Sequence, residues 1–253
     1  QIFLQGQLDF LFAESQNAGN YVGGVLRTGG AVAAQQHPGD VFQSFVRRIG
    51  IALQQRAAQQ ILRAALDWVD EAGLTRISMG ALAKRARLAR ATLYQHFTGK
   101  DALVEALVAS ELDKFYRRIH DFADGITDND ERLASGFGYA YAYLREHRAL
   151  QHVLASNPAL LLPYITGDSP QIQQGRRFFL GEIRRGEYRD GADVHAFADY
   201  FVRQLHSLLL TPLPPVEGTV DGPDHRGPSS ANVEAGRRYA QAFVLPVRAT
   251  IAP

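Results

Sequence analysis

The segment 59–103 constrains the fold of this chain more than any other stretch, because it reads as three short helices separated by breaks. Apolar residues recur at spacings of three and four from Ile61 to Val69, which is the pattern of one face of a helix. Gly73 follows this pattern and predicts the end of that helix. Ser78 then stands where a side chain would cap the start of the next helix.

Two short helices joined by a tight turn near Arg87 follow this cap. Their apolar residues are spaced to face inward: Met79, Leu82, Ala83, Leu88, Leu93 and Phe97. The outward positions of the second helix are polar or basic: Arg90, Thr92, Tyr94, Gln95 and His96. Three short helices, the last two joined by a tight turn, make a helix-turn-helix, which is typical of DNA-binding proteins. We therefore predict an all-α chain with a helix-turn-helix domain over residues 46–100.

Positive charge is concentrated in the same stretch. Between Arg56 and Lys100 there are eight basic residues and three acidic ones, a net charge of +5, whereas the whole chain carries only +1. A basic face of this kind attracts the phosphates of nucleic acid. The alternative is a small helical core whose basic face only meets solvent, and the ordered motif favours DNA over that alternative.

These residues resemble the amino-terminal domain of TetR-family transcriptional repressors. The resemblance is carried by Ala64-Ala65, Gly73, Leu82-Ala83, Thr92-Leu93-Tyr94-Gln95-His96-Phe97 and Lys100-Asp101-Ala102-Leu103. It implies that one set of side chains faces the major groove of double-stranded DNA: Arg90, Ala91, Thr92, Tyr94 and His96. It also implies that Ser78, Gln95 and Lys100 contact phosphates. Arg90 is the best candidate for reading a guanine, because a guanidinium can bond to both acceptors of that base.

Two positions depart from the family pattern. Arg87 stands in the turn where the family usually has Gly, so a left-handed backbone there would cost about 1 kcal/mol. Ala89 stands where the family often has a Ser or Thr cap, whose loss costs roughly 1 kcal/mol. Gly80 is small where some relatives carry a base-reading side chain, so the operator sequence cannot be inferred from the family. The alternative function is a helical protein-interaction module that has lost specific DNA binding, with Arg87 and Ala89 as marks of that loss.

The sequence carries no arrangement typical of an enzyme or of a metal site. The chain has no Cys, which excludes disulfides, thiolate metal sites and thiol nucleophiles. His147 and His152 are five residues apart, so they lie on different helix faces, and no carboxylate completes a metal site. No apolar run approaches the ~20 residues that span a bilayer. We therefore expect a cytoplasmic protein without catalytic residues, metal or cofactor, and without a membrane partner.

Glycine-rich residues 1–45 predict a poorly ordered or extended arm, and Val41–Gln55 is apolar enough to begin the first helix early. Residues 101–253 predict a larger helical domain for ligand binding and dimerisation, with a flexible Pro- and Gly-rich loop at 212–229. Its helix boundaries are signalled by Asp101, Gly125, Asp128 or Asp130, Asn157-Pro158, Ser169-Pro170, Ala192, Leu210 and Ser230. The first helix would bury Leu103, Leu107, Leu112, Phe115, Ile119 and Phe122, and Leu160–Tyr164 would form a short buried helix.

A near-heptad stripe in the helix Ala192–Leu210 suits a helix–helix interface: Val194, Phe197, Phe201, Leu205 and Leu208. The alternative is an internal core helix. In the TetR family the last two long helices of each subunit pack against their counterparts as a four-helix bundle. The resemblance implies that Ala192–Leu210 and Ser230–Thr250 are the matching pair, and hence a homodimer.

Aromatic residues are frequent in the carboxy-terminal half, and few charges fall on their stripes. We predict that five of them bind a lipophilic or amphipathic small molecule: Phe137, Tyr141, Tyr164, Phe178 and Phe201. The alternative is that these rings pack the core. A lactone or a fatty-acyl compound would fit this ligand class. Together the predictions describe a homodimeric repressor that leaves a palindromic operator when its ligand binds.

Overall fold

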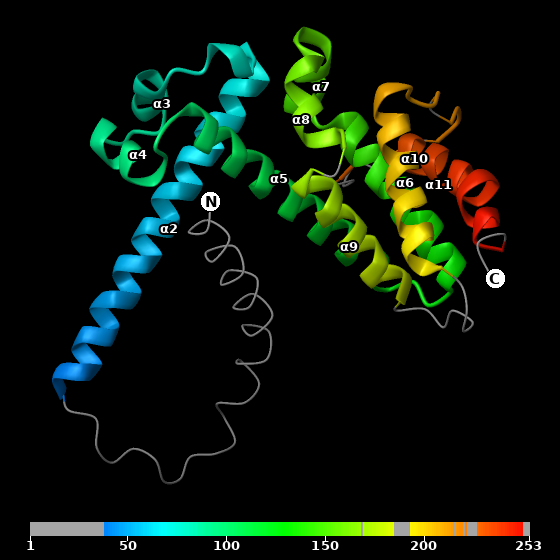
Figure 1. The fold of residues 1–253 in the computed structure, drawn as a ribbon, viewed down its shortest axis with the longest axis horizontal. Helices are drawn as coiled ribbons and strands as arrows, with labels where there is room; N and C mark the ends of the chain where they lie inside the picture. Colours follow the sequence, from blue (N-terminus) through cyan, green and yellow to red (C-terminus); the bar gives the residue numbers. More distant parts are fainter. Residues whose placement is uncertain are drawn as a thin grey trace. The chain divides into compact units, whose positions relative to one another are not determined.

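The computed structural model of the chain describes residues 38–167, 169–184, 193–214, 216–219, 221 and 227–249, and the regular elements among them are all helical (Figure 1). The predicted all-α fold is therefore confirmed. The chain divides into two compact units, residues 1–54 and residues 55–253. Residues 1–37 of the expected arm lie outside the described residues, whereas residues 38–45 form the first turns of helix α2 (Pro38–Ala72). The first helix thus begins early, as the apolar sequence from Val41 predicts.

The three short helices expected around residues 59–103 are present. Helix α2 ends at Ala72, where Gly73 takes a φ of 81°, a conformation that glycine adopts without strain. A 3-10 turn, η1 (Leu74–Arg76), leads to helices α3 (Met79–Arg85) and α4 (Arg90–His96). Their apolar residues share one buried core with α2: Ile61, Ala64, Ala65, Val69, Ile77, Leu82, Ala83, Ala86, Leu93 and Phe97.

Two helices from further along the chain pack into the same core, α5 (Lys100–Ala123) and α7 (Arg148–Ser156). Their buried contributions are Leu103, Leu107, Ala149 and Val153. At the edge of this contact, Arg148 Nε lies 3.8 Å from Asp70 Oδ2 of α2. The packing that supports the helix-turn-helix therefore continues beyond residue 100 and includes a helix about fifty residues downstream.

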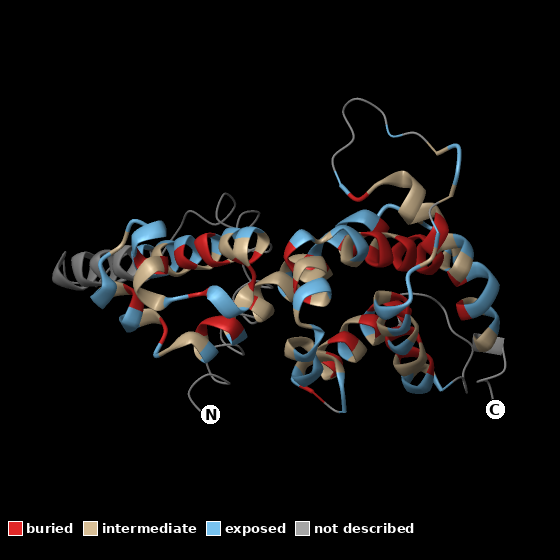
Figure 2. Cartoon of the chain, turned by 90° about the horizontal axis from the view of Figure 1, so that it is seen from above, coloured by how far each residue is buried: buried red, intermediate tan, exposed pale blue. Residues whose placement is uncertain are grey.

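A second buried core lies among the carboxy-terminal helices, and the buried residues of both cores are red in Figure 2. The helices around it are α5, α6 (Asn129–Glu146), α9 (Pro170–Arg184), α10 (Val194–Leu210) and α11 (Ser230–Tyr239). The chain also forms η2 (Pro158–Leu161), α8 (Leu162–Ile165), a π-helical turn η3 (Ala240–Val244) and a 3-10 turn η4 (Leu245–Ala249). The stripe of α10 is buried here, through Phe197, Phe201, Leu205 and Leu208. Of the two interpretations of that stripe, the internal core helix is correct.

Two of the helix starts predicted after residue 100 are confirmed by side-chain hydrogen bonds. Asp128 caps α6, accepting from the Glu131 N–H at 2.7 Å. The Ser169 hydroxyl accepts from the Ile172 N–H at 3.3 Å, at the start of α9. Ser230 is not the cap of α11, because it is already the first helical residue. Ser229 takes the cap position instead, where its N–H and hydroxyl are both held by the Glu146 carboxylate of α6.

Two apolar residues that were expected to be buried are exposed. Phe122, near the end of α5, is 41% exposed, and its ring stacks on Tyr139 of α6 with centroids 4.5 Å apart. Leu162 is 51% exposed, so the segment from Leu160 to Tyr164 is not a buried helix. That segment forms η2 and the four-residue α8, which are too short to turn consecutive leucines to one side.

Helices α6 and α11 cross with their backbones in contact at two glycines. A Cβ added to Gly236 would lie 2.9 Å from the Gly138 Cα, and a Cβ added to Gly138 would lie 2.8 Å from the Arg237 nitrogen. The latter Cβ would also collide with the Val233 carbonyl oxygen. Contacts this close to backbone atoms leave no room for any side chain, so the crossing requires glycine on both helices.

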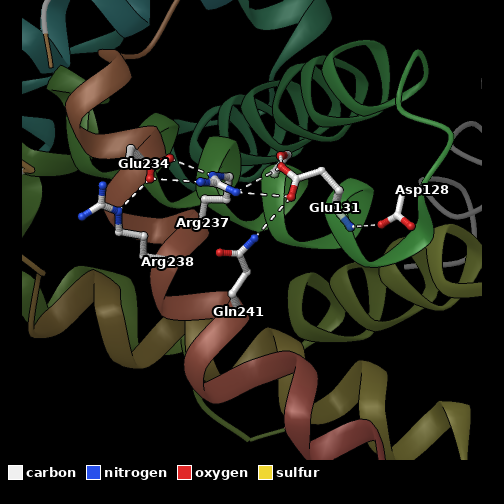
Figure 3. Close-up of polar contacts among 7 residues, drawn as sticks. Asp128, Glu131, Glu234, Arg237, Arg238 and Gln241 are labelled. Atoms are coloured by element: carbon white, nitrogen blue, oxygen red, sulfur yellow. Dashed lines mark hydrogen bonds and ion pairs between the residues drawn. The ribbon is translucent and has the colours of Figure 1, made fainter.

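An ion-pair network surrounds this crossing (Figure 3). Arg237 of α11 lies 3.2 Å from Glu131 of α6 and 2.7 Å from Glu234 of its own helix. Arg238 also lies 2.7 Å from Glu234. The hydrogen bond from Arg237 is the main reason that the pKa of Glu234 falls to about 2. Glu234 is therefore ionised at neutral pH, and Arg237 is held between two carboxylates, one on each helix.

We expect Gly138→Ala to lower the free energy of unfolding by about 1–3 kcal/mol, because its methyl group would force α6 and α11 apart. Urea denaturation followed by circular dichroism measures this loss. Gly181→Ala on α9 is the matched control, since nothing lies within 4 Å of its added Cβ. This control should keep or raise stability by up to ~1 kcal/mol. Equal losses in the two variants would contradict the close crossing.

Candidate nucleic-acid interface

Helices α3 and α4 are held in place by a few buried side chains and local hydrogen bonds. The Ser78 hydroxyl caps α3, accepting from the Ala81 N–H at 3.4 Å. The turn between the helices is closed by the Leu88 N–H, which donates to the Ala83 carbonyl at 2.9 Å. Leu93 of α4 is completely buried and Phe97 nearly so. Because these two anchors face the core, the opposite side of α4 is left for a partner.

The side chains predicted to meet DNA lie at the surface of α3, α4 and the start of α5. The exposed ones are Ser78, Arg90, Ala91, Tyr94 and Gln95, whereas Thr92, His96 and Lys100 are half-buried. Tyr94 is 40% exposed, which is unusual for a large aromatic residue beside a packed core. The structure thus leaves this whole set accessible from solvent.

Two of these residues also contact other parts of the chain. The Arg90 guanidinium carbon lies 5.5 Å from the centroid of the Tyr94 ring, within the range of a cation–π interaction. Lys100 Nζ donates to the Thr75 carbonyl at 2.9 Å and so joins the start of α5 to η1. This bond uses one of the three donors of the ammonium group, and two stay available for a phosphate.

The turn before α4 has the two features expected from its unusual residues. Arg87 has a φ of 52° and is the single non-glycine residue with positive φ among those described. Ala89 occupies the N-cap position of α4, and no side chain there bonds to the helix. Both features weaken the hold on α4, by about 1 kcal/mol each.

We expect Arg87→Gly to raise the free energy of unfolding relative to Arg87→Ala, because both remove the charge while only glycine relieves the left-handed strain. The difference should be roughly 0.5–1 kcal/mol, since the greater freedom of glycine in the unfolded chain offsets part of the gain. Parallel denaturant titrations of the two variants measure it. A glycine variant less stable than the alanine variant would show that the turn is not strained.

Most basic residues of the helix-turn-helix have no carboxylate partner within the part of the chain that the structure describes: Arg56, Arg63, Arg76, Lys84, Arg87, Arg90 and Lys100. Arg85 is the exception, because it forms two hydrogen bonds to Glu71, which lower the pKa of that carboxyl. In the carboxy-terminal helices, by contrast, arginines are commonly paired with acids: Arg117, Arg132, Arg176, Arg203, Arg237 and Arg238. The charge of the helix-turn-helix is therefore left uncompensated at its surface.

Four of the five residues predicted to bind a ligand lie in or against the carboxy-terminal core. Phe137 and Phe201 are buried and meet edge to face, with centroids 5.0 Å apart. Tyr141 is buried as well, and its hydroxyl donates to the Leu213 carbonyl at 3.1 Å. Phe178 packs against the same core from outside. The fifth, Tyr164, is half-buried on α8 and does not belong to that core.

Tyr141 also lines a shallow recess between α6, α7 and α10, which encloses about 0 Å³ of cavity volume and is partly open to solvent. The other lining residues are Leu144, Arg145, Gln151, Leu205, Leu208 and Leu209. Ligand pockets for drug-sized molecules enclose roughly 300–1,000 Å³. A ligand of that size would therefore need side chains around Tyr141 to move.

Neither a metal-binding cluster nor a helix able to cross a membrane occurs among the described residues. The two histidines considered from the sequence have structural contacts. His147 caps α7, accepting from the Leu150 N–H at 3.2 Å, and its other ring nitrogen lies 3.3 Å from Glu111. His152 packs against Gly73 at the end of α2.

Comparison with known proteins identifies the unit that these helices form. Residues 61–107 match the family model described as bacterial regulatory proteins of the tetR family. This part of the chain is a TetR-type helix-turn-helix domain. Its match covers α3, α4 and the parts of α2 and α5 that pack with them.

Curated relatives agree with this assignment. An HTH-type transcriptional regulator of Staphylococcus aureus is 31% identical over 103 residues, which are 40% of this chain and 56% of the relative. The chain thus spans little more than half the length of that regulator. An uncharacterised HTH-type transcriptional regulator of Mycobacterium tuberculosis is 29% identical over 156 residues, 62% of this chain and 76% of the relative.

Solved structures of TetR-family proteins share the fold. The repressor AlkX from Dietzia superposes with a TM-score of 0.55 at 17% identity, covering 77% of this chain and 98% of AlkX. A TetR-family regulator from Pectobacterium atrosepticum gives a TM-score of 0.53 at 22% identity, covering 76% of this chain and 94% of that protein. At these identities the likeness concerns the fold alone.

Proposed function

We propose that this TetR-family chain binds double-stranded DNA in the cytoplasm as a homodimeric repressor, and that a lipophilic small molecule releases it from a palindromic operator. The observation that carries the proposal is the surface of α4. It presents Arg90, Tyr94 and Gln95 to solvent on a helix-turn-helix whose cations mostly lack a carboxylate partner among the residues that the structure describes. Counterions released by phosphates would supply most of the affinity, and base contacts from α4 would supply specificity.

Each predicted DNA residue has a role suited to its place. Arg90 would donate two hydrogen bonds to a guanine, and Thr92 and His96 would meet base edges beside it. Ser78, Gln95 and Lys100 lie at or near helix ends, where they would hold phosphates and fix the position of α4 in the major groove. Ala91, exposed on the same helix, is small enough to lie against a thymine methyl group.

A homodimer would place two copies of α4 about one DNA turn apart, roughly 34 Å, so that each reads one half of a palindrome. The outer face of α10 and α11–η3 is the surface proposed for pairing. Leu210 and Phe243 are 59% and 60% exposed there. The Tyr200 hydroxyl donates to the Phe243 carbonyl at 2.9 Å, and the Tyr239 hydroxyl lies 2.7 Å from Gln204 Oε1. These bonds join α10 to α11–η3 into one surface.

The first experiment measures binding of the protein to DNA selected from a random pool, across a salt series. We expect one dimer, or a pair of dimers, per palindrome, with an affinity that falls steeply as salt rises, because each phosphate contact adds about 0.9 to the slope of log K against log salt. Tyr94→Ala should abolish the preference for the selected DNA. Phe122→Ala, which removes another exposed aromatic ring, should keep it.

Weak binding that is equal for wild type and Tyr94→Ala, on any DNA, would refute the DNA-binding role. It would favour the alternative of a helical protein-interaction module, for which the partner would be a protein.

We propose that the ligand releases the protein from DNA by binding in the carboxy-terminal core. A ligand that binds better to a dimer with widely spaced α4 helices would shift the population away from the DNA-binding form. A coupling of about 1–3 kcal/mol suffices to weaken operator binding 5- to 150-fold. The core is tightly packed around Phe137, Tyr141 and Phe201, so entry of a ligand would have to repack it, and Phe178 and Tyr164 would form the outer part of the site.

We expect a lactone or a long-chain fatty-acyl compound to release the protein from its selected DNA. Tyr141→Phe and Phe201→Leu should each reduce that release by at least tenfold, because one removes a hydroxyl group and the other an aromatic ring from the ligand site. Both substitutions preserve most of the side-chain volume, so the fold should be retained. Fluorescence anisotropy of labelled DNA, titrated with each compound, measures the release. Phe122→Ala should respond as the wild type does. Unaltered responses in both core variants would place the ligand elsewhere.

A further inference from the structure

The pairing of Arg90 with Tyr94 gives α4 a feature beyond a general basic surface. The two residues are four apart and therefore adjacent on the same side of the helix. The guanidinium lies over the ring at 5.5 Å, close enough for the negative face of the ring to attract the cation. The contact joins the residue best suited to read a base with the most exposed ring of the helix.

Within the described residues, the Tyr94 ring is the contact that limits the movement of the Arg90 side chain of α4. The helix reads RATLYQH and contains no acid, and no carboxylate from the rest of the described chain pairs with Arg90. A long, exposed arginine without partners samples many rotamers, and that freedom must be lost when it binds a base. The Tyr94 ring limits this freedom before DNA arrives.

The Tyr94 ring is not held in its position by packing in a hydrophobic core. The core is filled from α4 by Leu93 and, at its end, by Phe97. Tyr94 is 40% exposed and belongs to neither hydrophobic core. Its position is therefore explained by the surface, where its ring face meets Arg90.

We infer that Tyr94 is a positioning residue, whose ring presents the Arg90 guanidinium to one guanine of the operator. This inference rests on the proposed DNA-binding function and names the base that the site recognises. A planar guanidinium donates two parallel hydrogen bonds to O6 and N7 of guanine, which lysine cannot reproduce as a fork. The Tyr94 hydroxyl, by contrast, would serve affinity for any DNA through the sugar-phosphate backbone.

The test compares binding to the selected operator with binding to the same DNA after each G·C pair is changed in turn to A·T. The wild type should discriminate at one pair by about 5- to 150-fold. Arg90→Lys and Tyr94→Leu should both lose discrimination at that same pair. Tyr94→Phe should bind both DNAs more weakly while keeping the ratio, because the ring remains and only the hydroxyl is lost.

A double-mutant cycle separates positioning from an independent contact. If Tyr94 acts through Arg90, the variant Arg90→Lys with Tyr94→Leu should discriminate no worse than Arg90→Lys alone. Additive losses would overturn the inference. So would a Tyr94→Leu variant that keeps the preference at the pair that Arg90 reads, or a Tyr94→Phe variant that loses it.

NMR spectroscopy of the protein without DNA tests the contact between Arg90 and Tyr94 independently of DNA binding. The Arg90 side-chain protons should be shifted upfield by the ring in the wild type and in Tyr94→Phe, but not in Tyr94→Leu. Absence of that shift would overturn the inference even if the protein binds its operator. A normal shift in a protein without any base preference would instead refute the proposed function, and the assigned guanine with it.

Discussion

Helix α5 contributes buried residues to both hydrophobic cores. Its first half buries Leu103 and Leu107 with the helix-turn-helix, and its second half buries Phe115 and Ile119 with the carboxy-terminal helices. Because each set packs against different partners, a shift of α5 would disturb both cores. Lys100 adds a hydrogen bond from its start to Thr75, so the helix is also joined to the loop that precedes α3. Any signal that passes between a ligand and α4 would have this helix as its shortest covalent route.

The features that the sequence predicts well are local. Gly73, Ser78 and Asp128 mark helix ends through their own backbone or side-chain chemistry, and each does so in the structure. The left-handed Arg87 belongs to the same class, because a family position that requires glycine predicts the backbone whichever residue stands there. The contact of Arg90 with Tyr94 was also within reach, since spacing of four residues on a helix signals it.

The features that the sequence misses depend on distant parts of the chain. Periodicity identifies the apolar face of α5, and from this face alone it predicts that Phe122 is buried. It does not show whether another helix covers the end of α5. The close crossing at Gly138 and Gly236 joins residues almost a hundred positions apart, and neither glycine is marked by a local turn. The predicted ligand residues show the same limit. An aromatic stripe is equally suited to a core and to a pocket, and only packing separates the two.

The helix-turn-helix has several destabilising features at the surface where it would meet DNA. The turn is strained at Arg87, α4 has no side-chain cap, and most nearby cations have no carboxylate partner in the described part of the chain. Each feature costs stability in the free protein, and the opposing contribution comes mainly from the burial of Leu93 and Phe97. DNA phosphates would neutralise those cations, and a ligand that binds only the folded state stabilises it by mass action. The weaknesses of α4 are therefore consistent with local rules being broken at a binding surface, where the partner supplies what the chain lacks.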